Sequence, residues 1–202
     1  GPVQGKLFAY LLDYDEPFYL ANSSQTYGGF VTGALPLHGK TKLNLRASYA
    51  RQSDYRTNPF EYAADYWSFE GGSTLAGFTL TVGWEQLGSD NGRGLQTPVA
   101  TLHKFNGWAD LFLTTPANGL EDAYLSVTHK FDGVKALPGL NAAVAFHQFD
   151  SAKGDIEYGT EWDASIGAKF GKLGVLAKYA DYDAVGFGVN TRKFWLQAEY
   201  AF

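Results

Sequence analysis

The chain has 202 residues, of which 45% are hydrophobic and 16% aromatic, with no cysteine and a formal net charge of −5. The absence of cysteine excludes disulfides and thiolate metal sites, and an acidic chain without a basic block is not typical of nucleic-acid binding. No run of about twenty apolar residues occurs, which excludes a transmembrane helix. The apolar residues must be distributed in a pattern, and residues 1–202 are expected to form one domain because no stretch has linker composition.

The dominant pattern is alternation of polar with small or apolar side chains. It recurs in about ten segments of roughly ten residues, separated by stretches rich in turn residues, and helical periodicity is scarce. In chain order the segments are 4–14, 25–37, 41–54, 61–74, 78–88, 121–131, 140–150, 157–170, 173–183 and 192–202. The alternation predicts β-strands with one apolar and one polar face.

The first half of the chain contains both clear and ambiguous segments. In 41–54, Leu43 and Leu45 alternate with Lys42 and Arg46, and 78–88 alternates in the same way. In 61–74, however, Asp65 shares a face with Trp67 and Phe69. We expect a β-bulge there, or a different register.

The second half contains the two clearest strands. In 157–170, one face carries Tyr158, Trp162, Ala164, Ile166, Ala168 and Phe170, and the other carries Glu161, Asp163, Ser165 and Lys169. In 192–202, Phe194, Leu196, Ala198, Tyr200 and Phe202 oppose Lys193, Gln197 and Glu199. One face suits lipid and the other suits water. The terminal aromatics Tyr200 and Phe202 resemble the signal read by the machinery that assembles outer-membrane barrels.

The connections between segments alternate in length. Those after even-numbered segments are short, such as Gly171-Lys172, whereas those after odd-numbered segments are longer, the longest being 89–120. Soluble β-sandwiches also alternate, but short turns at one end and long loops at the other are typical of outer-membrane barrels. The predicted fold is therefore an all-β, antiparallel, up-and-down transmembrane β-barrel of about ten strands in a bacterial outer membrane. Closure would require the first strand, around Lys6 to Leu12, to pair with the last.

The long connection also carries a family resemblance. Gly94 to Asp110 reads GLQTPVATLHKFNGWAD and continues as LFLTTPANG to Gly119. This stretch resembles bacterial porins of the alginate-export-like family, and the surrounding strands resemble the C-terminal half of those proteins. The resemblance covers most of this chain and about half of the family's usual length. A natural small barrel, an excised C-terminal portion and a shortened larger barrel all fit, and Gly1-Pro2, which looks like a protease-cleavage scar, favours the last two.

The polar face predicts which residues line the lumen. The candidates are Lys6, Arg46, Asp65, Glu85, Lys130, Glu161, Asp163, Lys169, Lys178, Lys193 and Glu199. The resemblance implies a basic pathway for anionic solutes, with Arg46, Lys130, Lys169, Lys178 and Lys193 as its candidates. In a narrow barrel, however, opposite charges can pair across the bore and close it.

The long loop 89–120 lies either outside the barrel or folded into it. Phe105, Trp108 and Asp110 are candidates for a constriction, and 105–113 is expected to form a short helical turn. A packing role is favoured over gating.

Three functions follow. The first is passive passage of small, possibly anionic, solutes by a monomeric barrel surrounded by outer-membrane lipid, without cofactor or metal. The second is a shortened or engineered barrel with an occluded lumen and no transport. The third is a barrel hydrolase using His129 or His147, but no G-x-S-x-G motif supports it, and we expect no enzyme.

Overall fold

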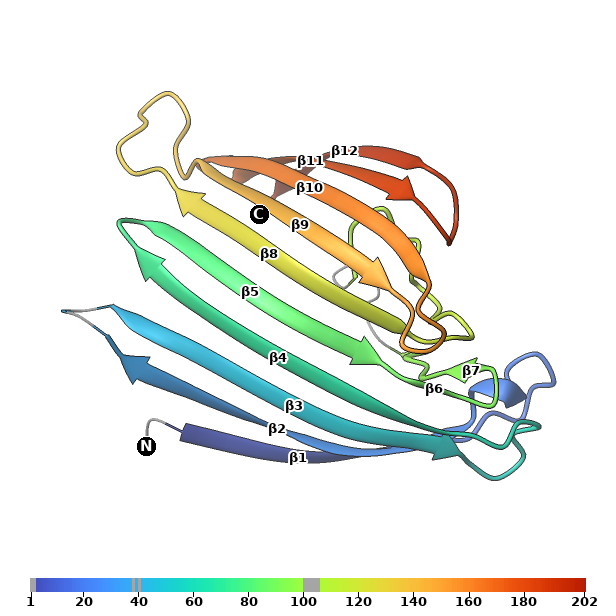
Figure 1. Cartoon of the computed structure of the whole chain (residues 1–202). Helices are drawn as coiled ribbons and strands as arrows, with labels where there is room; N and C mark the ends of the chain where they lie inside the picture. Colours follow the sequence, from blue (N-terminus) through green and yellow to red (C-terminus); the bar gives the residue numbers. More distant parts are fainter. Residues whose placement is uncertain (1–2, 38, 40, 100–105) are drawn as a thin grey trace.

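A computed structural model describes residues 3–37, 39, 41–99 and 106–202 (Figure 1). Ten long strands cross the molecule: β1 (Val3–Leu12), β2 (Ser24–Pro36), β3 (Lys42–Asp54), β4 (Ala63–Leu75), β5 (Phe78–Leu87), β8 (Leu120–Lys130), β9 (Asn141–Asp150), β10 (Glu157–Phe170), β11 (Leu173–Ala184) and β12 (Thr191–Tyr200). Each lies within a few residues of a predicted segment, so the ten-stranded all-β prediction is confirmed.

Small elements occur only at the long-loop end of the described chain. The loop after β1 contains the 3-10 helix η1 (Leu20–Asn22), and the loop after β5 begins with the paired strands β6 (Ser89–Asp90) and β7 (Arg93–Gly94). Residues 106–113 form turns and bends, so the predicted helical turn is absent over this described part of the loop. No described helix is long and apolar enough to span a membrane.

The strands form one curved sheet in which every strand pairs antiparallel with its sequence neighbour (Figure 1). The order is β1-β2-β3-β4-β5-β8-β9-β10-β11-β12, so β1 and β12 are the edges. The long loops gather at one end of the strands and the short turns at the other, as the connection lengths predicted. Pairing between β1 and β12, which closure requires, is not found among the described strands.

The two faces of the sheet differ as the alternation predicted. We call the face that contacts residues 106–119 the inner face and the opposite one the outer face. On the outer face Leu7, Leu196 and Phe194 are 93%, 72% and 68% exposed. An apolar surface this open is typical of a sheet that meets lipid rather than water.

The structure corrects two face assignments. The pairing of β4 with β3 and β5 runs without a register shift, so the bulge expected around Asp65 is absent from these ladders. Asp65 lies on the outer face, where its carboxylate pairs with Arg51 at 3.0 Å and accepts a hydrogen bond from Tyr49 at 2.8 Å. A register shift occurs instead between Glu157 and Gly159, where β10 meets β9.

Because of that shift, Tyr158 does not lie on the outer face with Trp162 and Ile166, where the alternation predicted it. Tyr158 is 3% exposed and its ring lies 5.9 Å from that of Phe112, on the inner side. Phe112, Phe149, Leu120 and Tyr182 belong to the same buried cluster. The hydrophobic core therefore lies between the 106–119 segment and the inner face, near the long-loop end.

Candidate functional site

The segment Asn106 to Gly119 packs on the inner face of β8 to β12. Its central ring, Phe112, lies 4.6 Å from Phe149 and 6.0 Å from Tyr182, measured between ring centroids. Phe112 is 7% exposed, whereas Phe149 and Tyr182 are fully buried. Burying one large aromatic side chain stabilises a fold by roughly 1.5–3 kcal/mol. The loop is thus folded inward and held by apolar contacts.

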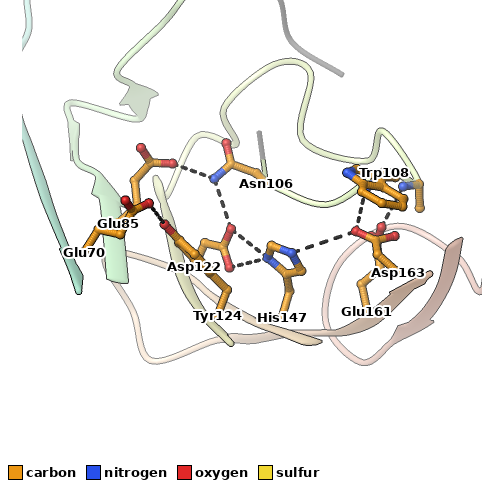
Figure 2. A network of polar contacts seen from close by, with 10 residues as sticks. Glu70, Glu85, Asn106, Trp108, Asp122, Tyr124, His147, Glu161 and Asp163 are labelled. Atoms are coloured by element: carbon orange, nitrogen blue, oxygen red, sulfur yellow. Dashed lines mark hydrogen bonds and ion pairs between the residues drawn. The ribbon is translucent and has the colours of Figure 1, made fainter. Parts of the chain in front are cut away.

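Two carboxylates of β10 also hold the loop by its backbone. The N–H of Ala109 donates to Glu161 Oε1 at 2.7 Å, and the N–H of Trp108 donates to Asp163 Oδ2 at 3.2 Å (Figure 2). Glu161 and Asp163 are 0% and 1% exposed. A buried backbone N–H needs an acceptor, and these two carboxyl groups supply one each. Both residues were predicted to face the lumen, and the structure places them on the inner face against the loop.

Gly107 allows this close approach. Its φ of +81° is in the left-handed region, and a Cβ on this residue would lie 2.5 Å from Glu161 Oε2. A larger residue would meet both backbone strain and a clash. Residues 106–108, Asn-Gly-Trp, form the tip of the loop, and the glycine lets this tip lie directly against β10.

A chain of polar contacts runs from this tip across the inner face (Figure 2). Asn106 Nδ2 donates to Glu85 Oε2 at 2.8 Å and lies 3.4 Å from Asp122 Oδ2. His147 Nδ1 lies 2.9 Å from Asp122, and its Nε2 lies 3.8 Å from Asp163. The imidazole links two carboxylates from different strands, so β5, β8, β9 and β10 share one network.

Two predicted lumen lysines contact the loop from β11 and β12. Lys193 Nζ forms an ion pair with Asp110 Oδ2 at 2.9 Å. Lys178 Nζ lies 4.0 Å from the centroid of the Trp108 ring, within the range of a cation–π interaction. Trp108 and Asp110, the described constriction candidates, are thereby fixed to the wall. Phe105, the third candidate, lies outside the described residues.

The beginning of the loop is held to β3 by amide groups. The Gln96 N–H donates to Gln52 Oε1 at 2.8 Å, and Gln52 Nε2 donates to the Gln96 carbonyl at 2.8 Å. The Tyr62 hydroxyl donates to the same Gln52 oxygen at 3.0 Å. Burial raises the pKa of Tyr62, which keeps its hydroxyl protonated as a donor.

The inner face of β1 to β5 is less filled. A cavity of about 480 Å³ lies there between the strands and the loop. Arg46 and Glu85 contribute opposite charges to its lining, and Phe8, Tyr10 and Phe30 contribute aromatic rings. The Arg46 guanidinium lies 3.9 Å from the Phe30 ring centroid, and Lys6 Nζ lies 5.9 Å from the same ring. We call this region the open half and the inner face of β8 to β12 the filled half.

The remaining predicted residues lie apart from this site. Lys130, Lys169 and Glu199 share the inner face by register but lie at the short-turn ends of their strands. The terminal aromatics Tyr200 and Phe202 are exposed, 57% and 105% respectively, with ring centroids 5.6 Å apart.

The two histidines considered for a hydrolase lie on opposite faces. His129 stacks on Phe78 at 4.0 Å on the outer face, whereas His147 is on the inner face. One active site cannot contain both. Among the described residues, no group of three or more histidine, aspartate or glutamate side chains is placed to hold a metal ion.

Several residues of the network were not predicted. Tyr66 donates to Glu85 at 2.5 Å, and Tyr124 donates to Glu70 at 2.7 Å. The alternation does predict an inner position for Glu70, because Glu70 follows Phe69 and adjacent residues of a strand lie on opposite faces. It contains no signal for Asn106 or Phe112, which lie in an irregular loop.

Comparisons with known proteins identify the fold. No protein-family model and no curated protein matches the sequence. Among solved structures, Pseudomonas aeruginosa OccK5 (OpdH) matches with a TM-score of 0.70 at 15% identity, covering 88% of this chain and 50% of that chain. Acinetobacter baumannii OccAB2 matches with a TM-score of 0.69 at 15% identity, covering 88% and 47%. Pseudomonas aeruginosa OccK3 (OpdO) matches with a TM-score of 0.68 at 18% identity, covering 88% and 49%.

At these identities the likeness concerns the fold. The chain spans about half the length of the structures that it matches, and its sheet corresponds to about half of the barrel of outer-membrane channels of the Occ family. The predicted resemblance to outer-membrane porins is supported at this coarser level. Membership of the alginate-export-like family remains a prediction.

Proposed function

We propose that the chain forms part of the wall of an outer-membrane channel through which small solutes pass passively. The observation that carries the proposal is the inward loop. It covers the filled half of the inner face, yet a cavity of about 480 Å³ remains beside it over the open half. A loop that narrows a lumen without filling it is what a size-selective channel requires.

The lining supports selection by a local field as well as by size. Arg46 and Glu85 place opposite charges around the same cavity. Lys178 and Lys193, two of the predicted basic pathway residues, are instead engaged with Trp108 and Asp110. We therefore propose that Arg46 and Lys6, rather than a long basic row, attract anionic groups of a solute.

The proposed location is the bacterial outer membrane. The apolar outer face, the two classes of connection and the fold shared with Occ channels all support it. We further propose that Tyr200 and Phe202 serve as the assembly signal, since both aromatic side chains are exposed at the end of β12.

Single-channel recording tests the proposal. The purified protein, refolded in detergent and added to a planar lipid bilayer, should give discrete conductance steps that scale with salt concentration. A heat-modifiable band on a gel should confirm that the sample is folded. Folded protein that inserts into the bilayer without any conductance would refute transport.

The second candidate function is that of a structural barrel whose lumen is occluded. It is favoured by the filled half, where His147, Asp122 and Asp163 form a continuous buried network with the loop. This candidate predicts a folded, inserted protein with no conductance. A barrel hydrolase has less support, since the solved structures of the same fold are channels. Turnover of an ester or peptide substrate that is lost in His147→Ala would revive it.

A further inference from the structure

Glu161 and Asp163 of β10 lie next to each other under the tip of the loop. They are two positions apart on one face of the strand, and they accept the N–H groups of two adjacent loop residues, Ala109 and Trp108 (Figure 2). Their side chains are also within hydrogen-bonding distance of each other. Both residues are buried. The loop is therefore held by two carboxyl groups that contact each other away from water.

One oxygen of each carboxyl group lacks a hydrogen-bond donor. Glu161 Oε1 and Asp163 Oδ2 accept the loop N–H groups, whereas Glu161 Oε2 and Asp163 Oδ1 are buried without a donor in the described part of the chain. An ionised carboxylate can only accept hydrogen bonds, but a protonated carboxyl group also donates one through its O–H. Two ionised groups in contact would repel each other and leave both oxygens unsatisfied. One proton held between the two groups removes both costs.

The neighbouring charged and titratable groups do not replace this proton. They are Glu85 of β5, Asp122 of β8, His147 of β9, Lys178 and Tyr182 of β11, Lys193 of β12 and Asp110 of the loop. His147 Nε2 lies 3.8 Å from Asp163 Oδ2, which is too far for a hydrogen bond. Lys178 attracts Asp163 electrostatically but donates to neither unsatisfied oxygen. The surrounding charges therefore influence the pair without supplying its missing donor.

We propose that Glu161 and Asp163 share one proton at neutral pH and form a pH-sensitive switch that holds the loop. When the loop leaves the inner face, water hydrates both groups, both ionise as exposed carboxyl groups do, and the proton passes to the solvent. The closed state thus binds one proton more than the open state, so a rise in pH favours opening and a fall in pH favours closure. A consequence for conduction rests on the proposed function: because this loop narrows the lumen, the channel should widen at alkaline pH.

Thiol labelling of the loop tests the switch, because the chain contains no native cysteine. Ala109 is 1% exposed and bound to Glu161, so the thiol of Ala109→Cys should react only when the loop opens. Its labelling rate in detergent is divided at each pH by the rate of Leu113→Cys, since Leu113 lies in the same loop and is 42% exposed. We expect this labelling ratio to be low at neutral pH and to rise by up to about tenfold per pH unit as the pair loses its proton.

Amide variants distinguish the carboxyl pair from its neighbours. Asp163→Asn keeps an oxygen for the Trp108 N–H and adds a permanent N–H donor beside Glu161, so the labelling ratio should stay low as the pH rises. Glu161→Gln is the matched variant and should behave in the same way. His147→Gln should retain the alkaline rise, because an imidazole ordinarily titrates below neutral pH. A rise that persists in Asp163→Asn would assign opening to the neighbouring lysines and overturn the proposal.

Two further measurements complete the test. If Ala109→Cys does not fold, proteolysis between β7 and β8 takes its place, normalised at each pH to the rate on the denatured chain, with the same expected rise and the same amide variants. Conductance in a planar bilayer should increase over the pH range in which the labelling ratio rises. A labelling transition without any conductance would refute transport and leave the switch intact. Conducting channels whose labelling ratio does not change with pH would leave transport intact and overturn the switch.

Discussion

The two halves of the inner face follow the same alternation but carry different structures. In the filled half, β8 to β12 bury Asp122, Glu161 and Asp163 beneath the loop, each at most 2% exposed. In the open half, β1 to β5 present Arg46, Phe30 and Glu85 to a cavity of about 480 Å³. A polar residue on the inner face can therefore either bind the loop or line the cavity.

The difference arises from what each half offers the loop. β10 supplies two carboxylates that accept backbone N–H groups from Trp108 and Ala109. The rings of Phe149 and Tyr182 pack against the ring of Phe112. In the filled half the carboxylates thus bind the loop backbone. In the open half Arg46 lies beside the cavity, and Glu85 lines it while accepting hydrogen bonds from Tyr66 and Asn106. Substitutions in the filled half should mainly change stability, and those in the open half should mainly change conduction.

The largest expected effect is at Phe112. Phe112→Ala removes the ring that packs between Phe149 and Tyr182, and truncation of a buried aromatic side chain costs roughly 3–5 kcal/mol. Denaturant unfolding should show this loss, and any channel should become wider or noisier. Leu113→Ala is the matched control, because Leu113 is adjacent and 42% exposed. Equal losses in the two variants would contradict the buried-anchor interpretation.

The second effect concerns the carboxylate under the loop. Glu161→Ala leaves the Ala109 N–H without its acceptor, and an unsatisfied buried donor costs roughly 1–3 kcal/mol. We expect lower unfolding stability and faster proteolysis between β7 and β8. Glu161→Gln retains an acceptor oxygen and should recover much of the stability. If Gln and Ala behave alike, the hydrogen bond to Ala109 is not what holds the loop.

The third effect belongs to the open half, and at Arg46 it should leave stability unchanged. A unit charge about 8 Å from a passing ion changes its energy in water by about 0.5 kcal/mol, which is about twofold in permeability. Arg46→Ala should therefore lower the anion-to-cation permeability ratio, and Glu85→Gln should raise it, as measured by reversal potentials in a salt gradient. Screening should reduce both changes at high salt. Shifts of the same sign in both variants would show that the two residues do not act through their charges.

The sequence predicted the strands well because alternation is a local property. Ten segments, their order and the two classes of connection follow from it, and so does the inner position of Glu161, Asp163 and Lys193. It does not reveal whether an inward side chain contacts solvent or a loop. That outcome depends on the path of residues 106–119, where turns replace any regular period.

Tyr158 and Asp65 show where alternation itself is insufficient. The register shift between Glu157 and Gly159 places Tyr158 on the face opposite to the expected one. In the sequence this shift is marked by a single glycine, Gly159, whose φ in the structure is +145°. Asp65 breaks the apolar pattern without a bulge, because Tyr49 and Arg51 provide it with partners on the outer face. Cross-strand neighbours such as these cannot be read from one strand alone.

The smallest effect is expected at Asp65, which belongs to neither half of the inner face. Its partner Arg51 is exposed, and ion pairs in contact with solvent contribute little to stability. Asp65→Asn should leave both the unfolding midpoint and the reversal potential close to those of the parent protein. Asp181→Asn is the natural control, since Asp181 has the same Tyr and Arg partners, Tyr179 and Arg192, on β11 and β12. A change in ion selectivity in Asp65→Asn alone would mean that this carboxylate faces the lumen after all, and that the division between inner and outer faces is wrong at β4.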